Sequence, residues 1–268
     1  MRLDVYLSEN GYASSRQKAK DMIGAGSVFV NGVSVTKPAY DVGESAEIEI
    51  RGEVLPYVGR GGYKLAGALD AFRIDPAGFT CVDIGASTGG FTDCLLQRGA
   101  AFVYAVDSGS GQLAPSLCAD ARVCSVEKFN ARQLDSSVTN GRVSLAVCDV
   151  SFISLSYIFE PVTRVLCPYD RETKAGSFLA LIKPQFEAGR DAIGKNGIVR
   201  DAKVHLRVVQ NVIASAETFG LFCAGAAPSP ILGGDGNREF LGWFVYGCPE
   251  ARDAALSDRA ALARSLGL

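Results

Sequence analysis

The sequence predicts an α/β protein preceded by a small α+β module. From Lys64 onward, short apolar runs alternate with helical patterns, which is typical of a parallel sheet covered by helices. Residues 1–50 instead combine two helical patterns with a hairpin signal, and a glycine-containing stretch separates the two regions. The length of 268 residues suits two domains of unequal size. We therefore expect domains at 1–55 and 64–268, joined by a linker at 56–63.

The first module is predicted from local signals. Its expected elements are helices over 2–10 and 14–26, a hairpin over 27–35 and a strand over 44–50. Serines precede the second helix, and Gly24 and Gly26 follow its periodic part, as helix-ending residues do. Asn31-Gly32, flanked by apolar residues, is a strong hairpin signal. Strict alternation of polar and apolar side chains predicts the last strand.

The larger region contains five apolar runs of the buried-strand type, at 79–85, 101–107, 121–127, 143–150 and 178–184. Polar residues lie at or just after the ends of these runs: Asp83, Asp107, Glu127, Asn130, Asp149 and Lys183. Because the carboxyl ends of parallel strands meet at one edge of a sheet, these side chains predict a site there. Glu239 opens the last β run and joins the same edge if that strand is antiparallel.

Composition excludes several classes of protein. The net charge of −2 is not that of a polycation, so any nucleic acid must bind a local patch. The N-terminus lacks the apolar core of a signal peptide and no run reaches ~18 apolar residues, so we expect no membrane span. None of the eight cysteines forms a C-x-x-C pair, which favours reduced thiols in a cytoplasmic protein, buried at Cys81, Cys148 and Cys223. The single histidine, His205, lies in a helical pattern, and we expect no metal site.

The segment from Asp83 to Phe91 is similar to a nucleotide loop, but Ser87 stands where G-x-G-x-x-G has its second glycine. Its glycines let the backbone approach a ligand closely, and Asp107 is placed to bind the two hydroxyls of a ribose. Asp83 suits a cationic or amino-bearing ligand and would repel a pyrophosphate. S-adenosylmethionine has a ribose, a sulfonium and an amino group but no phosphate, so it is the predicted ligand. The alternative is a close-packed strand–helix turn that binds nothing.

Two lysines and two carboxylates are expected to converge at the same edge: Lys64, Asp149, Lys183 and Glu239. Transfer of a methyl group to a sugar hydroxyl needs alignment of that hydroxyl and removal of its proton. A lysine beside carboxylates stays protonated and would orient the hydroxyl, and it becomes a base only if burial or a second lysine lowers its pKa. The alternative for each residue alone is a surface ion pair.

These motifs resemble a known family. Residues 2–38 look like an S4 RNA-binding domain. The segments RGGYKL, DIGASTGGFTD, CDVSFISL, LIKPQFEAGR and GNREF are similar to the TlyA family, whose catalytic domain is of the FtsJ/RrmJ type. The resemblance implies a Rossmann-like S-adenosylmethionine-dependent methyltransferase domain, with a seven-stranded, mostly parallel sheet and one antiparallel strand. It also implies 2′-O-methylation of ribose, in cytidine, in ribosomal RNA, although the family also carries the name haemolysin.

The resemblance assigns roles to residues. It implies a catalytic tetrad of Lys64, Asp149, Lys183 and Glu239. The expected cofactor-binding residues are Asp83, Gly85, Ala86, Ser87, Thr88, Gly89, Gly90, Phe91, Asp107, Asn130 and Asp149. The expected RNA-binding residues are Arg16, Lys18, Lys20, Asn31 and Lys37. Arg190, Lys195 and Arg200 lie in a glycine-rich loop that could close over the RNA.

Three rival functions remain open. A non-catalytic protein that binds ribosomal RNA would show no methyl transfer. A pore-forming haemolysin would lyse cells whether or not Lys183 is present, but the chain lacks a spanning helix, an alternating barrel pattern and a secretion signal. A nicotinamide oxidoreductase is disfavoured by Ser87 and by Asp83, and a binding titration with both cofactors would separate it from a methyltransferase.

Overall fold

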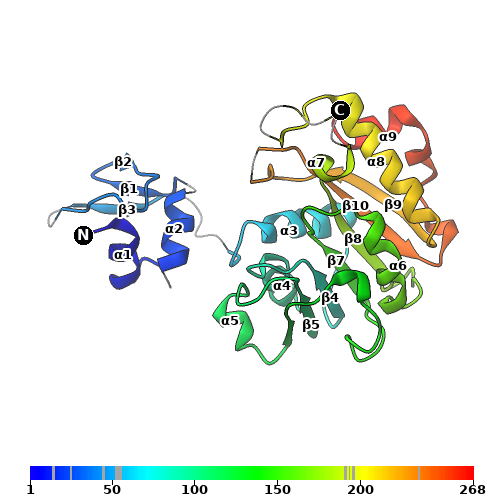
Figure 1. The fold of residues 1–268 in the computed structure, drawn as a ribbon, viewed down its shortest axis with the longest axis horizontal. Helices are drawn as coiled ribbons and strands as arrows, with labels where there is room; N and C mark the ends of the chain where they lie inside the picture. Colours follow the sequence, from blue (N-terminus) through cyan, green and yellow to red (C-terminus); the bar gives the residue numbers. More distant parts are fainter. Residues whose placement is uncertain are drawn as a thin grey trace. The chain divides into compact units, whose positions relative to one another are not determined.

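The computed structural model describes residues 1–13, 16–24, 26–43, 46–51, 56–189, 192, 194, 197–234 and 236–268. It divides into two compact units, Met1–Val58 and Gly59–Leu268. Each unit has a core of its own and is described by itself (Figure 1).

The first unit packs two helices against a small antiparallel sheet (Figure 1). Its elements are α1 (Leu3–Glu9), α2 (Arg16–Gly24), β1 (Val28–Val30), β2 (Val33–Ser34) and β3 (Ile48–Ile50), with strand order β2-β1-β3. The predicted hairpin is present, and Asn31 and Gly32 take φ values of 51° and 79°, as a tight turn between two strands requires. Leu3, Leu7 and Ile23 are fully buried between the helices and the sheet.

The second unit is an α/β structure built on a seven-stranded sheet (Figure 1). Its strands are β4 (Thr80–Ile84), β5 (Phe102–Val106), β6 (Val123–Val126), β7 (Leu145–Cys148), β8 (Ser177–Ile182), β9 (Leu221–Pro228) and β10 (Phe240–Tyr246). The strand order is β6-β5-β4-β7-β8-β10-β9, and β10 runs antiparallel to both of its neighbours. The expected sheet with a single antiparallel strand is confirmed.

Helices connect these strands. They are α3 (Gly61–Phe72), α4 (Gly90–Gln97), α5 (Pro115–Cys118), α6 (Ser156–Val165), α7 (Pro184–Glu187), α8 (Ala202–Glu217) and α9 (Arg259–Ser265), with 3-10 turns η1 (Ala131–Gln133), η4 (Pro249–Ala251) and η5 (Ala254–Ser257). The main core lies between the sheet and helices such as α6 and α8, and includes Phe159, Phe178 and Phe244. None of the described helices is long and apolar enough to cross a membrane.

Two helix starts depend on glycines. The α4 helix begins at Gly90. Gly89 precedes it with φ of 94°, so the glycines belong to the helix entry as well as to the loop. The α3 helix begins at Gly61, inside the 56–63 stretch expected to be linker. Its first two residues are glycines, which composition alone favours as linker residues.

Candidate active site

The four residues of the expected tetrad form two ion pairs at the carboxyl edge of the sheet. Lys183 Nζ lies 2.6 Å from Asp149 Oδ1, and Lys64 Nζ lies 2.6 Å from Glu239 Oε2. Asp149 directly follows β7 and Lys183 directly follows β8. Glu239 directly precedes β10, whose first residue pairs with the last residue of β8, so Glu239 and Lys183 adjoin at the same edge. The antiparallel direction of β10 is what brings this carboxylate to the lysines.

Lys183 is held in a restricted conformation. Pro184 follows it, and its backbone is extended, with φ of −109° and ψ of 102°, as expected before a proline. Its ammonium donates to Ser151 Oγ at 2.8 Å in addition to its ion pair with Asp149. An ammonium has three N–H donors, so the hydrogen bond to Ser151 leaves donors for a substrate. Only 9% of the Lys183 side chain is exposed, against 21% of Asp149.

The pair of Lys64 and Glu239 is more deeply buried, with 10% and 3% of the side chains exposed. Lys64 lies in the first turn of α3, so the start of this helix decides where its ammonium sits. A buried ion pair contributes little net stability, but removing one partner leaves an uncompensated charge at a cost of ~3–5 kcal/mol. The ion pair therefore serves to position the side chains of Lys64 and Glu239 rather than to stabilise the fold.

The glycines of the 85–90 loop are required by contacts inside the protein. A Cβ at Gly85 would lie 2.9 Å from the carbonyl oxygen of Asp149. A Cβ at Gly90 would lie 3.0 Å from the backbone nitrogen of Gly62 and 3.2 Å from the carbonyl oxygen of Gly59. The loop thus packs closely against the strand end that carries Asp149 and against the turn that precedes Lys64.

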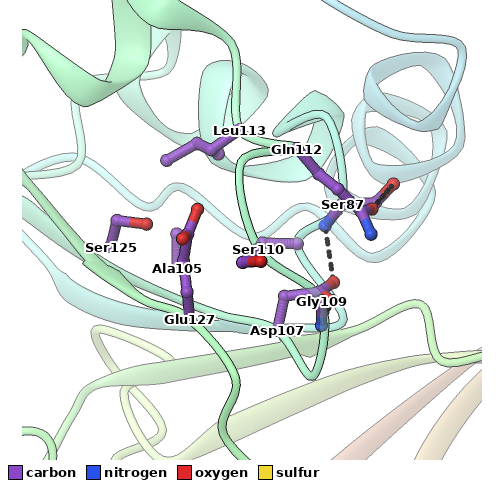
Figure 2. A pocket seen from close by; sticks show the side chains of 10 residues that line it. Ser87, Ala105, Asp107, Gly109, Ser110, Gln112, Leu113, Ser125 and Glu127 are labelled. Atoms are coloured by element: carbon purple, nitrogen blue, oxygen red, sulfur yellow. Dashed lines mark hydrogen bonds between the residues drawn. The ribbon is translucent and has the colours of Figure 1, made fainter.

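A pocket adjoins this loop at the ends of β4, β5 and β6 (Figure 2). Its lining residues are Ala86, Ser87, Ala105, Asp107, Gly109, Ser110, Gln112, Leu113, Ser125 and Glu127. Asp107 accepts hydrogen bonds from the backbone N–H groups of Ser87 at 2.8 Å and Gly109 at 2.7 Å. Glu127 accepts one from the N–H of Gly111 at 2.8 Å. Two carboxylates on neighbouring strand ends therefore hold the segment that covers the pocket.

Asp83 lies beneath the loop and has no exposed surface. Its Oδ2 accepts from the backbone N–H and the hydroxyl of Thr92, at 3.0 and 2.7 Å, whereas Oδ1 has no hydrogen-bond partner among the described residues. The pKa of Asp83 is raised to about 7, chiefly by burial and also by the nearby carboxylates of Asp149 and Asp107, while the hydrogen bonds from Thr92 act to lower it. In this position Asp83 ties the end of β4 to the first turn of α4.

Asn130 is not among the residues that line this pocket. It is exposed, and its side chain caps η1 by accepting from the N–H of Arg132 at 3.1 Å. Glu127, which the sequence also places after β6, lines the pocket instead. An acidic residue at a strand end is a signal that could have selected Glu127, because Asp107 was selected on that ground.

Two further residues of the site belong to the loop after Asp149. Ser151 contacts Lys183, as described above. Phe152 is 91% exposed and takes a φ of 65°, which is unusual for a bulky residue. Its ring centroid lies 5.1 Å from that of Phe186, whose ring lies 5.8 Å from Lys183 Nζ. An exposed aromatic side chain therefore stands beside the tetrad.

The first unit presents cations that are held by a buried carboxylate. Asp4 has no exposed surface, and it accepts from Arg2 Nε at 3.0 Å and from Arg16 Nε at 2.8 Å. These guanidinium groups hold the pKa of the Asp4 carboxyl well below its usual range. About half of each arginine side chain remains exposed, so the pair is both ordered and accessible. The sequence pointed to Arg16 but not to Arg2.

The other expected RNA-binding residues are arranged differently. Lys20 is partly exposed and Lys37 is exposed. The side chain of Lys18 lies outside the described part of the chain. Asn31 is exposed, but its Oδ1 accepts from the N–H of Glu47 at 2.8 Å and thereby braces the hairpin.

Of the expected closing loop, Arg190 and Lys195 lie outside the described residues, whereas Arg200 is described and exposed. His205 is buried in α8, with Nε2 2.9 Å from the carbonyl oxygen of Val199. The eight cysteines are free thiols, and Cys118 is exposed. Across the described ranges, no group of three or more His, Cys, Asp or Glu side chains could hold a metal ion.

The sequence and the fold of this chain are similar to those of known proteins. The sequence matches the S4 domain family over residues 1–48 and the FtsJ-like methyltransferase family over residues 57–246. It is 46% identical over 241 residues to a Bacillus subtilis protein named "Putative rRNA methyltransferase YqxC", covering 90% of this chain and 84% of that protein. It is 42% identical over 243 residues to the "16S/23S rRNA (cytidine-2'-O)-methyltransferase TlyA" of Mycobacterium tuberculosis, covering 90% of this chain and 88% of that protein.

A solved structure described as "Putative hemolysin from Streptococcus thermophilus" superposes with a TM-score of 0.77 at 41% identity, and the match covers 99% of this chain and 95% of that one. The two matched ranges cover most of both units, and the FtsJ-like range contains Lys64, Asp149, Lys183 and Glu239. The chain therefore belongs to the FtsJ-like methyltransferase family and, within it, to the TlyA family.

Proposed function

We propose that this protein transfers a methyl group from S-adenosylmethionine to a ribose 2′-hydroxyl, that of a cytidine, in ribosomal RNA of the cytoplasm. The observation that carries the proposal is the pair of contacts Lys183–Asp149 and Lys64–Glu239 at the carboxyl edge of a methyltransferase sheet. The relatives named above as rRNA methyltransferases support the choice of RNA as substrate.

The cofactor pocket fits S-adenosylmethionine by its donor and acceptor groups. Asp107 and Glu127 offer carboxylates to ribose hydroxyls, and Ser87 and Ser125 offer hydroxyls. The bound cofactor would supply an electrophilic methyl group on a sulfonium. The chain's own part is to hold the ribose and to aim the methyl group at the tetrad.

Lys183 is proposed to act on the substrate hydroxyl. Its ammonium is held by Asp149 and Ser151, and an N–H that is not bonded to Ser151 can donate to the 2′-oxygen and fix its direction of attack. Alignment of two reacting groups contributes several kcal/mol to lowering a barrier. Asp149 lies beside this oxygen and is proposed to orient Lys183 and to help remove the proton of the hydroxyl.

Lys64 and Glu239 are proposed to support the site from within. Their buried ion pair fixes the start of α3 relative to the start of β10. Lys64 then contributes positive charge near the 2′-oxygen of the substrate while that oxygen loses its proton. This electrostatic effect is strong where water is excluded.

The substrate is proposed to be recognised by both units. Unstacked RNA bases are commonly held against aromatic side chains, and Phe152 offers an exposed ring beside the tetrad. The cations of the S4 unit would bind RNA phosphates, so the affinity for RNA would depend on salt concentration. These cations are Arg2, Arg16 and the lysines of the unit. In this proposal residues 1–55 bind ribosomal RNA or a ribosomal subunit, residues 56–63 link the two domains, and residues 64–268 catalyse methyl transfer. The proposed reaction uses no metal ion, and the protein acts away from membranes.

The test is transfer of labelled methyl from S-adenosylmethionine to ribosomal RNA, followed by mapping of 2′-O-methyl groups with and without the protein. The proposal expects one or few new cytidine positions that resist alkaline cleavage. Binding of RNA without transfer would favour a non-catalytic role. Lysis of cells by purified protein that is unchanged in Lys183→Ala would favour the haemolysin alternative.

A further inference from the structure

The short segment 183–187 contacts the loop 149–155 at three successive places. Lys183 contacts Asp149 and Ser151 at the start of the loop. Phe186 stacks against Phe152 in its middle. At its end, Glu187 Oε2 accepts from Ser154 Oγ at 2.7 Å and Oε1 accepts from the N–H of Leu155 at 2.8 Å. The catalytic lysine and the loop that surrounds it are thus joined by the one turn of helix α7.

Glu187 helps to cap α6 although it lies far away in the sequence. Ser154 Oγ accepts from the N–H of Ser156 at 3.2 Å, and Glu187 in turn accepts from the Ser154 hydroxyl and from the N–H of Leu155, the residue that precedes the helix. The first N–H groups of a helix lack partners within the helix, and a carboxylate is the group best suited to them. Glu187 is partly buried, and burial raises the pKa of its carboxyl. A carboxylate that is removed from water and held by two donors has few alternative positions.

The loop needs this restraint. Phe152 takes a left-handed backbone conformation with φ of 65°, which costs a non-glycine residue ~1–3 kcal/mol. At the start of the loop, the N–H of Asp149 donates to the carbonyl oxygen of Ile84 at 3.0 Å, which fixes it to the sheet. Glu187 is the matching attachment at the other end. Between the two attachments lies Ser151, the hydroxyl that directs the ammonium of Lys183.

We propose that Glu187 is a positioning residue for methyl transfer: by holding Ser154 and Leu155 it fixes the 149–155 loop so that Asp149 and Ser151 together orient Lys183 toward the substrate. The inference rests on the proposed function. Glu187 acts through Lys183 and its two partners, and its loss displaces these groups while leaving the cofactor pocket, built on other strand ends, unchanged.

The variants are Glu187→Ala, which removes both hydrogen bonds, and Glu187→Gln, which keeps the shape. A glutamine oxygen can still accept from the N–H of Leu155, and its amide can donate to the Ser154 hydroxyl. Glu160→Ala is the matched control, since it removes an exposed carboxylate of α6 that pairs with Arg164 four residues on. The measurements are single-turnover methyl transfer to ribosomal RNA, cofactor affinity by calorimetry, thermal unfolding, and hydrogen exchange of the loop amides.

The expected result for Glu187→Ala is a transfer rate reduced by ~10–100-fold at saturating RNA, since small misplacements of reacting groups have effects of this size. Cofactor affinity should stay unchanged, and the amide of Leu155 should exchange faster. Glu187→Gln should transfer within ~3-fold of the original protein, because it keeps both hydrogen bonds, and Glu160→Ala should match the original protein.

An unchanged transfer rate in folded Glu187→Ala, or a Gln variant as slow as the Ala variant, would overturn the positioning role. If the original protein itself transfers no methyl group to RNA, the proposed function fails instead. Hydrogen exchange then decides the structural part of the inference, because unchanged exchange at Leu155 in Glu187→Ala would overturn it independently of activity.

Discussion

Asp107 accepts two backbone N–H groups, from Ser87 and from Gly109, so its carboxylate is already oriented before any ligand arrives. A carboxylate has further lone pairs that can accept from ribose hydroxyls. We expect Asp107→Ala to weaken S-adenosylmethionine binding by about 2 kcal/mol, the scale of hydrogen bonds to a charged group. Calorimetry of the folded variant measures this, and an unchanged affinity would remove Asp107 from the cofactor site.

The raised pKa of Asp83 leads to a prediction of how the stability of the protein depends on pH. Its pKa in the folded protein is about 7, above its usual 3.8, so the folded state keeps a proton that the unfolded chain has released. The contribution of Asp83 to the free energy of unfolding should therefore be greatest below pH ~4, fall by a few kcal/mol as the pH rises toward 7, and level off above it.

The variant Asp83→Asn isolates this effect. An asparagine can still accept from Thr92 but does not titrate, so contributions from all other groups cancel in the difference between the two proteins. Urea unfolding at several pH values should show the variant gaining stability relative to the original protein as the pH rises from about 4 to about 7. A difference that does not change with pH would mean that Asp83 titrates near its usual value.

At the scale of single residues, the sequence predicted the tetrad but not the residues that surround it. Strand-end positions and family motifs selected Lys64, Asp149, Lys183 and Glu239, and the structure brings them together as two ion pairs. The contacts of Ser151 and Glu187 depend on a loop whose path includes a left-handed phenylalanine, which no propensity rule anticipates.

At the scale of elements, the glycines of the 85–90 loop set how closely α4 approaches the turn before α3. We expect Gly90→Ala to push this turn away, because its Cβ would lie 3.0 Å from the backbone nitrogen of Gly62 and backbone cannot yield as a side chain can. The displacement should lower stability by ~1–3 kcal/mol and slow methyl transfer by moving Lys64.

Gly234→Ala is the control for Gly90→Ala, since a Cβ at Gly234 meets nothing within 4 Å and its φ is not positive. Chemical denaturation and single-turnover assays of both variants give the comparison. If Gly90→Ala behaves like Gly234→Ala, the glycine serves the approach of a ligand rather than the packing of α3 on α4.

The elements themselves were largely predictable. Apolar runs bounded by polar residues indicated β4 to β8 and β10, and the conditional placement of Glu239 depended on β10 being antiparallel, which it is. The start of α3 was missed because Gly61 and Gly62 are unfavourable inside a helix by propensity. They are tolerated at its beginning, where they allow the close approach of Gly90.

At the scale of the whole molecule, two units divide recognition and chemistry between them. We expect replacement of Arg16 and Lys20 by alanine to weaken RNA binding, because fewer phosphates are then neutralised. The slope of log affinity against log salt should fall by ~1 for each phosphate that is no longer bound, and cofactor affinity should not change. Arg207→Ala, an exposed arginine of α8, is the matched control. Titrations at several salt concentrations decide the matter, and an unaltered slope would mean that these cations are only solvated.

The division into two units follows from the sequence, because a change from local hairpin signals to strand–helix alternation is visible in it. The net charge of −2 gives no hint of RNA binding, since the first unit itself carries eight acidic residues beside its six lysines and arginines. The fixing of Arg2 and Arg16 by buried Asp4 could not be foreseen, because it depends on how α1 packs against α2.

The central claim is that Lys183 works on the ribose hydroxyl during methyl transfer. The most direct measurement is single-turnover transfer from S-adenosylmethionine to ribosomal RNA by Lys183→Ala, with cofactor and RNA affinities measured in parallel. We expect a rate lower by at least ~10²-fold, the size of effect that misplacement of a reacting group can have, with both affinities nearly intact. Lys183→Arg should not restore the rate, since a planar guanidinium has another shape and cannot place its N–H groups where the ammonium places them. Lys203→Ala, which replaces an exposed lysine of α8, should behave as the original protein. Near-normal transfer by Lys183→Ala would contradict the account.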